Sequence, residues 1–392
     1  MFVTFGTGLR RCTNRFTANG VVGQLPHKAE RSACRQRSAR TLARLEQRRR
    51  ENVPGDVYVT SGCIDCDTCR WMAPSIFDRV GSQSAVVHQP ETDAERVRTL
   101  QAAAACPVGT IRTESPPPAG LSKQAREAFP ELIATSGDER SGTRVYHLGY
   151  HSAKSFGATS YLVLPDGDRW KDAAFMTDSP RYFRPLADQI EQLLKREGRQ
   201  LRYIFLTHVD DVADHEKWAE RFQVRRIMHA DDIDDADERS TLASIEIPLT
   251  GSGPWLLTPE SVTKWPAGAA SPAPDRHGVK IIHVPGHTRG CIAAIVDNYV
   301  AFTGDHIAYS ETRNAVTGFP QVCWFDWSLV IESTAKLAEE AFVWIMPGHG
   351  RRYHYASVEA MRQGLTESIA LMDSDLYWAM VPYRARGRVR SS

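Results

Sequence analysis

Four of the eight cysteines in the 392-residue chain have the spacing of ligands to an inorganic cluster. Three of them form a Cys-x-x-Cys-x-x-Cys run, and the fourth stands apart and directly precedes Pro107. Thiolates at every third position of a tight loop can hold three irons of a cubane, and a distant cysteine closes the fourth corner. Tetrahedral zinc is the alternative, but it more often uses two separated Cys-x-x-Cys pairs, so the spacing favours one 4Fe–4S cluster. The four predicted cluster ligands are Cys63, Cys66, Cys69 and Cys106.

The segment around these cysteines resembles single-cluster bacterial-type ferredoxins. The resemblance rests on the CxxCxxC start, on Ala73-Pro74-x-x-Phe77 and on the Cys106-Pro107-Val-Gly-x-Ile111 close. It implies one-electron transfer, and the cysteine at the middle position of the run implies four irons instead of three. The alternative role for such a cluster is purely structural.

Four short apolar runs in the second half of the chain each stop at a histidine or an aspartate. Short apolar runs bounded by Gly and Pro are typical of buried strands. Strand ends in an α/β sheet share one edge, where ligand sites form, so these side chains can converge on a divalent metal. The runs end at Thr207-His208, Pro285-Gly286-His287, Thr303-Gly304-Asp305 and Pro347-Gly348-His349.

These motifs resemble those of the metallo-β-lactamase superfamily over roughly residues 144–365. The opening segment His147–Leu164 and Thr177-Asp178-Ser179 fit the first hairpin of that family. The resemblance implies a four-layer αβ/βα sandwich. It also implies that Asp305 bridges two metals and that His287 and His349 serve one metal each.

The first metal motif departs from the family signature T-H-x-H-x-D-H. The segment Thr207–His215 reads THVDDVADH. Aligned without gaps, Asp210 takes the place of the second histidine, whereas Val212 and Ala213 replace the Asp-His pair. Two ligands of a second metal are then missing, unless the Asp-His pair that follows directly supplies them.

We therefore expect one or two divalent ions, zinc or iron, in the second half of the chain. Asp305, His208 and Asp210 are the candidate catalytic residues. Two imidazoles and one carboxylate, here His208, His287 and Asp305, form the facial arrangement of non-heme iron(II) enzymes, and persulfide dioxygenases of the superfamily resemble that selection. The alternative for the segment 211–214 is an N-cap that opens a helix over 214–222. The complete candidate ligand set is His208, Asp210, Asp214, His215, His287, Asp305 and His349.

The chain that positions these residues divides into four parts. Residues 1–52 contain 12 Lys and Arg against 3 Asp and Glu, which predicts an organelle transit peptide or a disordered basic segment. Residues 54–113, with a helical run at 92–105, form a small α+β ferredoxin-like domain. The Pro-rich start of residues 114–143 predicts a linker. Residues 144–392 form the α/β sandwich.

Charge and hydropathy limit the partners. Beyond residue 52 the chain has 36 Lys and Arg against 44 Asp and Glu, which argues against nucleic acid. No run of about 18 apolar residues occurs, so we expect no membrane span. A transit peptide with a ferredoxin-like module favours the chloroplast stroma, and the mitochondrial matrix is the alternative.

A cluster and a metal site on one chain are consistent with three functions. The first is a metal-dependent hydrolase fused to a ferredoxin-like electron-transfer module. The second is a redox enzyme whose mononuclear or dinuclear iron receives electrons from the cluster and acts on oxygen or a sulfur species. The third is a non-catalytic electron-transfer or sensor protein. All three functions are compatible with a redox partner protein, and the first two require a small-molecule substrate.

Overall fold

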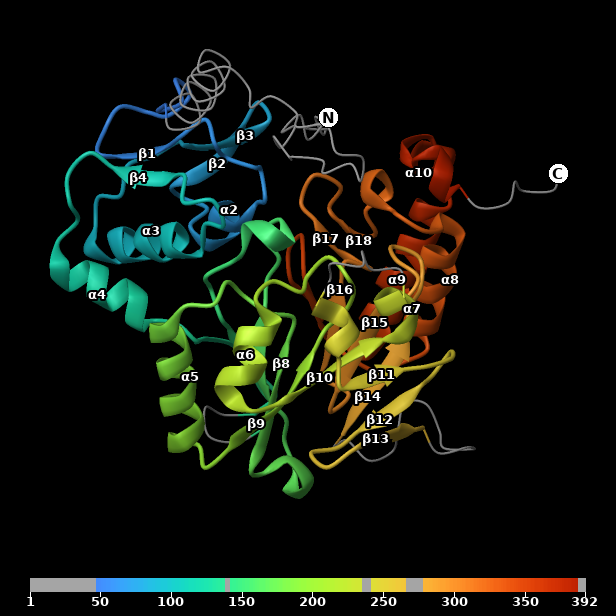
Figure 1. The fold of residues 1–392 in the computed structure, drawn as a ribbon. Coiled ribbons are helices and arrows are strands. Elements are labelled where there is room, and N and C mark those ends of the chain that lie inside the picture. The colour runs from blue at the N-terminus through green and yellow to red at the C-terminus, as the bar shows by residue number, and fades with distance from the viewer. Residues whose placement is uncertain (1–46, 138–141, 235–240, 266–277, 387–392) are drawn as a thin grey trace, which may run out of the picture.

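The structure, a computed structural model, describes residues 47–137, 142–234, 241–265 and 278–386 (Figure 1). Most of the predicted targeting segment, residues 1–46, lies outside the described residues. Its last residues pack onto the N-terminal unit: Arg48 forms an isolated bridge with Thr60, and Arg49 is buried. Folded structure therefore begins before residue 54, the start expected from the sequence. Among the described residues, no helix combines the length and apolar character needed to cross a bilayer.

The N-terminal unit is a small α+β fold built around the cysteine run. Its longer helix starts at a capping box, because the Thr92 hydroxyl accepts from the Glu95 N–H and the Glu95 carboxylate accepts from the Thr92 N–H. Its elements are β1 (Val57–Val59), α2 (Thr68–Met72), β2 (Phe77–Val80), β3 (Gln83–Val86), α3 (Asp93–Ala105) and β4 (Ile111–Thr113). Strand β1 pairs with β4 and β2 pairs with β3, both antiparallel.

The predicted linker carries regular structure, which corrects the expectation for residues 114–143. Helix α4 (Ala119–Glu127) begins directly after the Pro-rich run, and strand β5 (Glu131–Thr135) follows it. Strand β5 pairs antiparallel with β6 (Arg144–His147) and is an edge strand of the first large sheet. A run of prolines cannot continue a helix, but it can precede one.

Two seven-stranded sheets form the second unit and pack face to face. The first has the order β11-β10-β9-β8-β7-β6-β5, and the second β13-β12-β14-β15-β16-β19-β20. The further strands of the first sheet are β7 (Tyr161–Leu164), β8 (Ala173–Thr177), β9 (Gln200–Phe205), β10 (Arg225–His229) and β11 (Ile247–Leu249). The strands of the second are β12 (Trp255–Leu257), β13 (Val262–Lys264), β14 (Val279–His283), β15 (Ile292–Val296), β16 (Val300–Gly304), β19 (Trp344–Pro347) and β20 (Tyr353–His354).

Helices cover the outer face of each sheet, which gives the expected four-layer αβ/βα sandwich (Figure 1). Helices α5 and α6 lie on the first sheet, and α8 and α9 lie on the second. Side chains from both inner faces, including Phe175, Phe205, Ile281 and Phe302, form the buried core between the sheets. The helices are α5 (Arg184–Arg196), α6 (His215–Phe222), α7 (Ala230–Asp234), α8 (Trp327–Ala338), α9 (Val358–Met372) and α10 (Asp375–Met380). A separate hairpin consists of β17 (Ala308–Ser310) and β18 (Ala315–Thr317).

The four predicted ligand motifs follow four strands of this sandwich. His208 follows β9 of the first sheet, whereas His287, Asp305 and His349 follow β14, β16 and β19 of the second. Strands β16 and β19 are parallel neighbours, so Asp305 and His349 leave the second sheet at the same edge. Gly304, at the end of β16, has φ +50, and a Cβ there would lie 2.5 Å from Thr207 Oγ1, so this turn requires glycine.

Candidate functional site

The four predicted cluster cysteines line one cavity of the N-terminal unit, and Val59, Ile64 and Val108 are among its other walls. Asp65 and Asp67 adopt left-handed backbone conformations, with φ 60 and 66, which tighten the loop that carries the cysteine run. The Thr110 N–H donates to Cys106 Sγ at 3.4 Å, and the Asp65 N–H donates to Cys63 Sγ at 3.5 Å.

Four sulfur atoms around one cavity fit a 4Fe–4S cluster. Burial raises the pKa of the Cys66 thiol to about 12 and also raises the pKa of Cys69. Such buried thiols become thiolates only beside a compensating cation, which iron provides. The backbone N–H groups that face the sulfur atoms are the donors that stabilise thiolate ligands. The structure thus brings the four predicted cysteines together.

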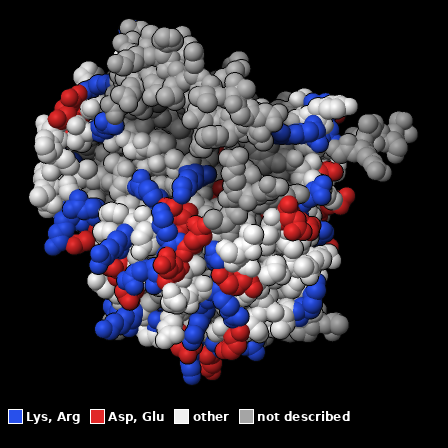
Figure 2. Space-filling view, in the orientation of Figure 1, with Lys and Arg blue, Asp and Glu red and all other residues white. Residues whose placement is uncertain are grey.

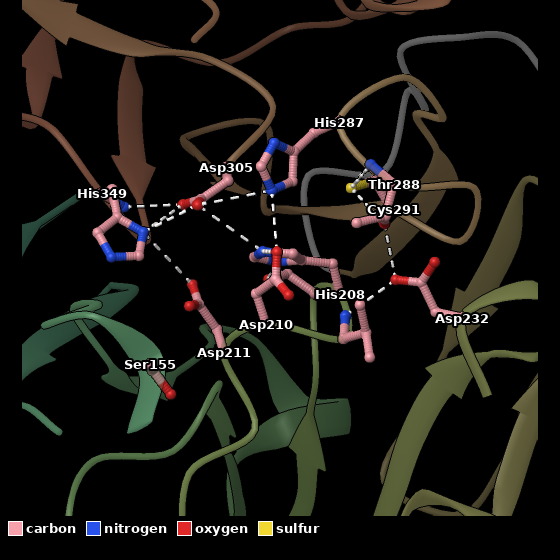
Figure 3. A network of polar contacts seen from close by, with 12 residues as sticks. Ser155, His208, Asp210, Asp211, Asp232, His287, Thr288, Cys291, Asp305 and His349 are labelled. Carbon is pink, nitrogen blue, oxygen red and sulfur yellow. Dashed lines mark hydrogen bonds and ion pairs between the residues drawn. The ribbon is translucent and has the colours of Figure 1, made fainter. Parts of the chain in front are cut away.

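Four side chains from the two sheets surround one point at the edge of the sandwich (Figure 3). Asp305 Oδ2 lies 3.7 Å from His208 Nε2 and 3.8 Å from His287 Nε2. Asp210 Oδ2 lies 3.9 Å and 3.4 Å from the same two nitrogen atoms. Ligands of a tetrahedral ion stand about 3.4 Å apart when each is about 2.1 Å from the metal. Among them, His208, Asp210 and His287 bring three donor atoms within 4.8 Å of one another, and Asp305 lies beside both histidines, so these residues can hold a divalent ion.

Burial and unpaired donor atoms support this assignment. The His208 side chain is fully buried, and its Nε2 has no hydrogen-bond partner among the described residues. Its Nδ1 lies 3.0 Å from Thr207 Oγ1, and that hydroxyl donates to Asp178, which fixes the ring orientation. Burial raises the pKa of Asp178 to about 7. Asp210 is 45% exposed, so the ion would face solvent on that side.

His349 and Asp211 lie on the opposite side of Asp305 (Figure 3). His349 Nδ1 is 2.8 Å from both Asp305 oxygen atoms and 4.0 Å from Asp211 Oδ2. Burial disfavours the charged ring, but Asp305 and Asp211 outweigh it and raise the pKa of His349 to about 10. Asp211 is fully buried, and both its carboxylate oxygens lack a hydrogen-bond partner among the described residues.

Asp211 is the site residue that sequence reasoning missed. The alternative of a helix N-cap for the segment 211–214 does not account for it, because α6 begins at His215 and is preceded by Asp214 in a left-handed conformation. Instead, burial raises the pKa of Asp211 well above its usual value, and the nearby Asp305 raises it further. His208, Asp211 and Asp305 offer three donor atoms within 4.8 Å of one another. The one available signal was the unbroken pair of aspartates, Asp210 and Asp211, two residues after His208.

Asp214 and His215 lie outside the candidate metal site of the second domain, which corrects the expectation that they supply metal ligands. The Asp214 carboxylate accepts from Lys154 at 2.8 Å, from Lys217 at 3.1 Å and from the Tyr182 N–H. His215 Nδ1 lies 3.1 Å from Arg226 Nη1. These contacts fasten the start of α6 to the first sheet and its neighbouring loops.

A second histidine group, His229 with Asp231 and His283, also brings donor atoms within 4.8 Å. The two imidazole rings stack with their centroids 4.1 Å apart and an angle of 7° between the planes. Because ring nitrogen lone pairs lie in the ring plane, those of stacked rings run parallel and do not converge on one ion. This group is therefore a packing contact between β10 and β14.

Two family models match separate parts of the chain. Residues 59–113 match the 4Fe-4S single cluster domain of Ferredoxin I, and residues 166–355 match the metallo-beta-lactamase superfamily. The chain joins a ferredoxin domain to a metallo-β-lactamase domain. A search of curated proteins found no match.

Solved structures similar to the metallo-β-lactamase domain have low sequence identity. A metallo-beta-lactamase from Hirschia baltica is 16% identical, with a TM-score of 0.42, over 62% of this chain and 96% of its own. ETHE1 from Myxococcus xanthus is 16% identical, with a TM-score of 0.37, over 58% of this chain and 84% of its own. A superfamily protein from Sulfolobus tokodaii is 16% identical, with a TM-score of 0.38, over 59% and 86%.

The candidate ligands of this domain form two groups on either side of Asp305. Asp210 replaces a histidine in the set that it forms with His208 and His287. In the other set Val212 and Ala213 replace two ligands, and Ala213 is buried. Asp211 falls on a variable position of the family signature, and it lies close to His349, which forms an ion pair with Asp305.

Replacing Asp211 with asparagine is expected to have opposite effects on stability and on metal binding. In metal-free protein at neutral pH the free energy of unfolding should rise by about 1 kcal/mol, because a buried carboxyl group without partners is replaced by a neutral amide that can donate to Asp305. If Asp211 helps to hold an ion, metal affinity should fall. Denaturant unfolding with and without metal measures both quantities. A variant that is less stable without metal would show that Asp211 has a structural role instead.

Proposed function

We propose that the protein is an iron–sulfur oxidoreductase in which the ferredoxin domain serves the metal centre of the metallo-β-lactamase domain. When bound, a 4Fe–4S cluster supplies one-electron transfer. An iron ion held by His208, Asp210, His287 and Asp305, here called the His/Asp set, would supply a site for dioxygen or a sulfur species. The observation that supports this proposal over hydrolysis is a short loop that contacts the cluster cysteine Cys66 and also His349, the ion-pair partner of the candidate ligand Asp305.

This loop, residues 152–157, follows β6 and packs between the two domains. A Cβ at Gly157 would lie 2.9 Å from Cys66 Cβ and 3.2 Å from Cys66 Sγ, so the backbone of the loop contacts a cluster cysteine directly. Ser155 is hydrogen-bonded through its backbone to His349, and the Phe156 ring centroid lies 6.3 Å from that of His349. Three consecutive residues therefore connect Cys66 with His349.

Further contacts hold the domains in this arrangement. Asp67, in the cluster loop, accepts a hydrogen bond from Arg351 Nε at 2.9 Å. The guanidinium of Arg352 lies 4.5 Å from the centroid of the Trp71 ring. Arg98 on α3 pairs with Glu131 on β5 at 2.7 Å. These contacts fix the cluster loop against the domain that carries the metal site, which a hydrolase with an independent cluster would not need.

The test of the proposed function is the magnetic interaction between the two centres. In protein whose cluster is reduced by dithionite, electron paramagnetic resonance measures the microwave power that half-saturates the cluster signal. A paramagnetic ion held by His208, His287 and Asp305 should raise this power several-fold relative to His287→Ala protein. Equal saturation in both proteins would contradict the proposal.

Gly157→Ala is expected to weaken cluster retention and to lower stability. The residue has φ +93, and the added Cβ would also meet Cys66 and Pro107 within about 3 Å. We expect a loss of about 2–3 kcal/mol in the free energy of unfolding and faster loss of the cluster. Gly198→Ala is the matched control, because Gly198 has φ +67 but no atom within 4 Å of its added Cβ, so it should lose only about 1–2 kcal/mol. Equal effects of the two substitutions would show that the loop does not press on the cluster site.

Metal-dependent hydrolysis is the second candidate, because Asp210 is 45% exposed, which leaves the metal site open to solvent, and because imidazole and carboxylate ligands also suit zinc. Zinc in this site, with ester hydrolysis that survives removal of the cluster, would favour it.

We also propose that the protein acts on a small molecule with a redox partner protein, and not on nucleic acid. On the face drawn in Figure 2, the Lys and Arg side chains of the described residues are interspersed with Asp and Glu and form no continuous basic surface there. The chloroplast stroma, with the mitochondrial matrix as the alternative, remains a proposal from the composition of residues 1–52. Fusion of this segment to a fluorescent protein tests it by the compartment that the fusion enters.

A further inference from the structure

Two buried histidines lie between the ferredoxin domain and the first sheet, outside both ligand sets. His147 ends β6, His151 follows in the next loop, and both are fully buried. Their Nε2 atoms lie 2.9 Å apart, so one ring donates to the other. His151 Nδ1 lies 2.8 Å from the carbonyl oxygen of Gly157 and 3.1 Å from Thr68 Oγ1.

The pair is one part of a continuous line of polar atoms. At one end, Thr68 Oγ1 lies 3.4 Å from Sγ of the cluster cysteine Cys66. At the other end, His147 Nδ1 lies 3.7 Å from Glu131 Oε2, and the Glu131 side chain is 27% exposed. The line therefore leads from a partly exposed carboxylate through two imidazoles and one hydroxyl to a cluster ligand.

A count of the N–H hydrogens of the two neutral imidazoles shows that the contact between His147 Nδ1 and Glu131 has no proton. A neutral imidazole carries one N–H, so the pair has two. If His151 donates from Nδ1 to Gly157, His147 must donate from Nε2 to His151. The His147 Nδ1 lone pair then faces the Glu131 carboxylate. Among the described residues, His147 Nδ1 and Glu131 Oε2 are indeed buried atoms without a hydrogen-bond partner.

We propose that the His147–His151 pair takes up one proton when the ferredoxin domain takes up one electron. A one-electron donor protein is oxidised and the cluster domain is reduced by one electron. The proton comes from solvent by way of Glu131 and binds at His147 Nδ1, where it forms the missing N–H donor to the carboxylate. No bond to iron or sulfur forms or breaks in this step.

The charges around the pair keep it neutral until the electron arrives. Burial lowers the pKa of His147 to about 4, Glu131 opposes this shift, and Arg352 and Arg98 add to it. Burial also lowers the pKa of His151, and His147, His349 and Arg352 add to that shift. An added electron places a negative charge beyond Thr68, and a nearby negative charge favours a protonated imidazole.

This inference rests on the redox-active cluster of the proposed function, but not on an ion in the metallo-β-lactamase domain. The measurement is the midpoint potential of the cluster in the full chain, titrated with dithionite between about pH 5 and pH 8. In the parent protein the potential should become more negative as the pH rises through the coupled range. One proton per electron corresponds to about 59 mV for each tenfold change in proton concentration.

Glu131→Gln tests the missing donor directly. The side-chain amide introduced by this substitution can donate to His147 Nδ1 and can still accept from Arg98, so the line is satisfied without an added proton. We expect the pH dependence to be lost. Glu197→Gln is the matched control, because Glu197 forms an ion pair with Arg144 at 2.7 Å, the distance of the Arg98–Glu131 pair, and that variant should keep the parental slope.

Two outcomes would overturn the proposal: a pH-independent potential in the parent protein, which needs no variant, or an unchanged slope in Glu131→Gln. The His287→Ala protein should keep the slope. If the proposed oxidoreductase function fails but this inference holds, the parent and His287→Ala proteins will have equal half-saturation power. The cluster potential of both will still depend on pH.

Discussion

Cys106→Ser is expected to abolish the cluster while the metallo-β-lactamase domain keeps its ion. Cys106 is the one cluster cysteine supplied from outside the run, and it follows the helix α3 that closes the small domain. Without it one corner of the cubane loses its thiolate. Visible absorption should disappear, and acid-labile sulfide should fall from about four per chain to near zero. The second-domain metal content should not change.

The control for this variant is Cys323→Ser. Cys323 is also buried, but it lies in the other domain and donates to the carbonyl oxygen of Gly286. A serine hydroxyl can make the same bond, so cluster absorption should equal that of the parent. An intact chromophore in Cys106→Ser would remove Cys106 from the ligand set.

His287→Ala should produce the second large effect, the loss of the second-domain ion. His287 supplies one of two imidazoles, and its Nε2 is within 3.8 Å of both carboxylates of the set. Removal of an outer-shell partner already costs about 10–100-fold in metal affinity, so we expect at least about 100-fold weaker binding from loss of a ligand. Metal analysis after dialysis against a chelator measures it, and cluster absorption should stay unchanged.

His283→Ala is the control, since His283 lies four residues earlier and stacks on His229 outside the ligand set. It should retain the ion. Equal metal loss in both variants would mean that the loop after β14, and not the His287 ligand, governs binding.

The ligands that could be predicted from the sequence were those that follow a recurrent local pattern. The cysteine run and its closing Cys-Pro are visible within single short segments. His208, His287, Asp305 and His349 each end a short apolar run, so their convergence followed from the shared edge of a sheet.

Residues whose role depends on distant packing could not be predicted. Asp211 belongs to the site because Gly348, from the end of β19, leaves room for its carboxylate: a Cβ on that glycine would lie 2.4 Å from Asp211 Oδ2. From local sequence Asp211 was indistinguishable from a helix cap. Strand β5 was missed because it follows prolines and is short, and its partner β6 stabilises it. The contact of Gly157 with Cys66 joins segments that are far apart in sequence.

Two different inorganic centres in one chain require a specific elemental composition, which can be counted. After anaerobic purification, iron, zinc and acid-labile sulfide are measured per chain. We predict about four sulfides and about five irons, four in the cluster and one on the His/Asp set. A chain that holds zinc on its four thiols with no sulfide, or that holds no metal beyond the cluster, would contradict the presence of two such centres.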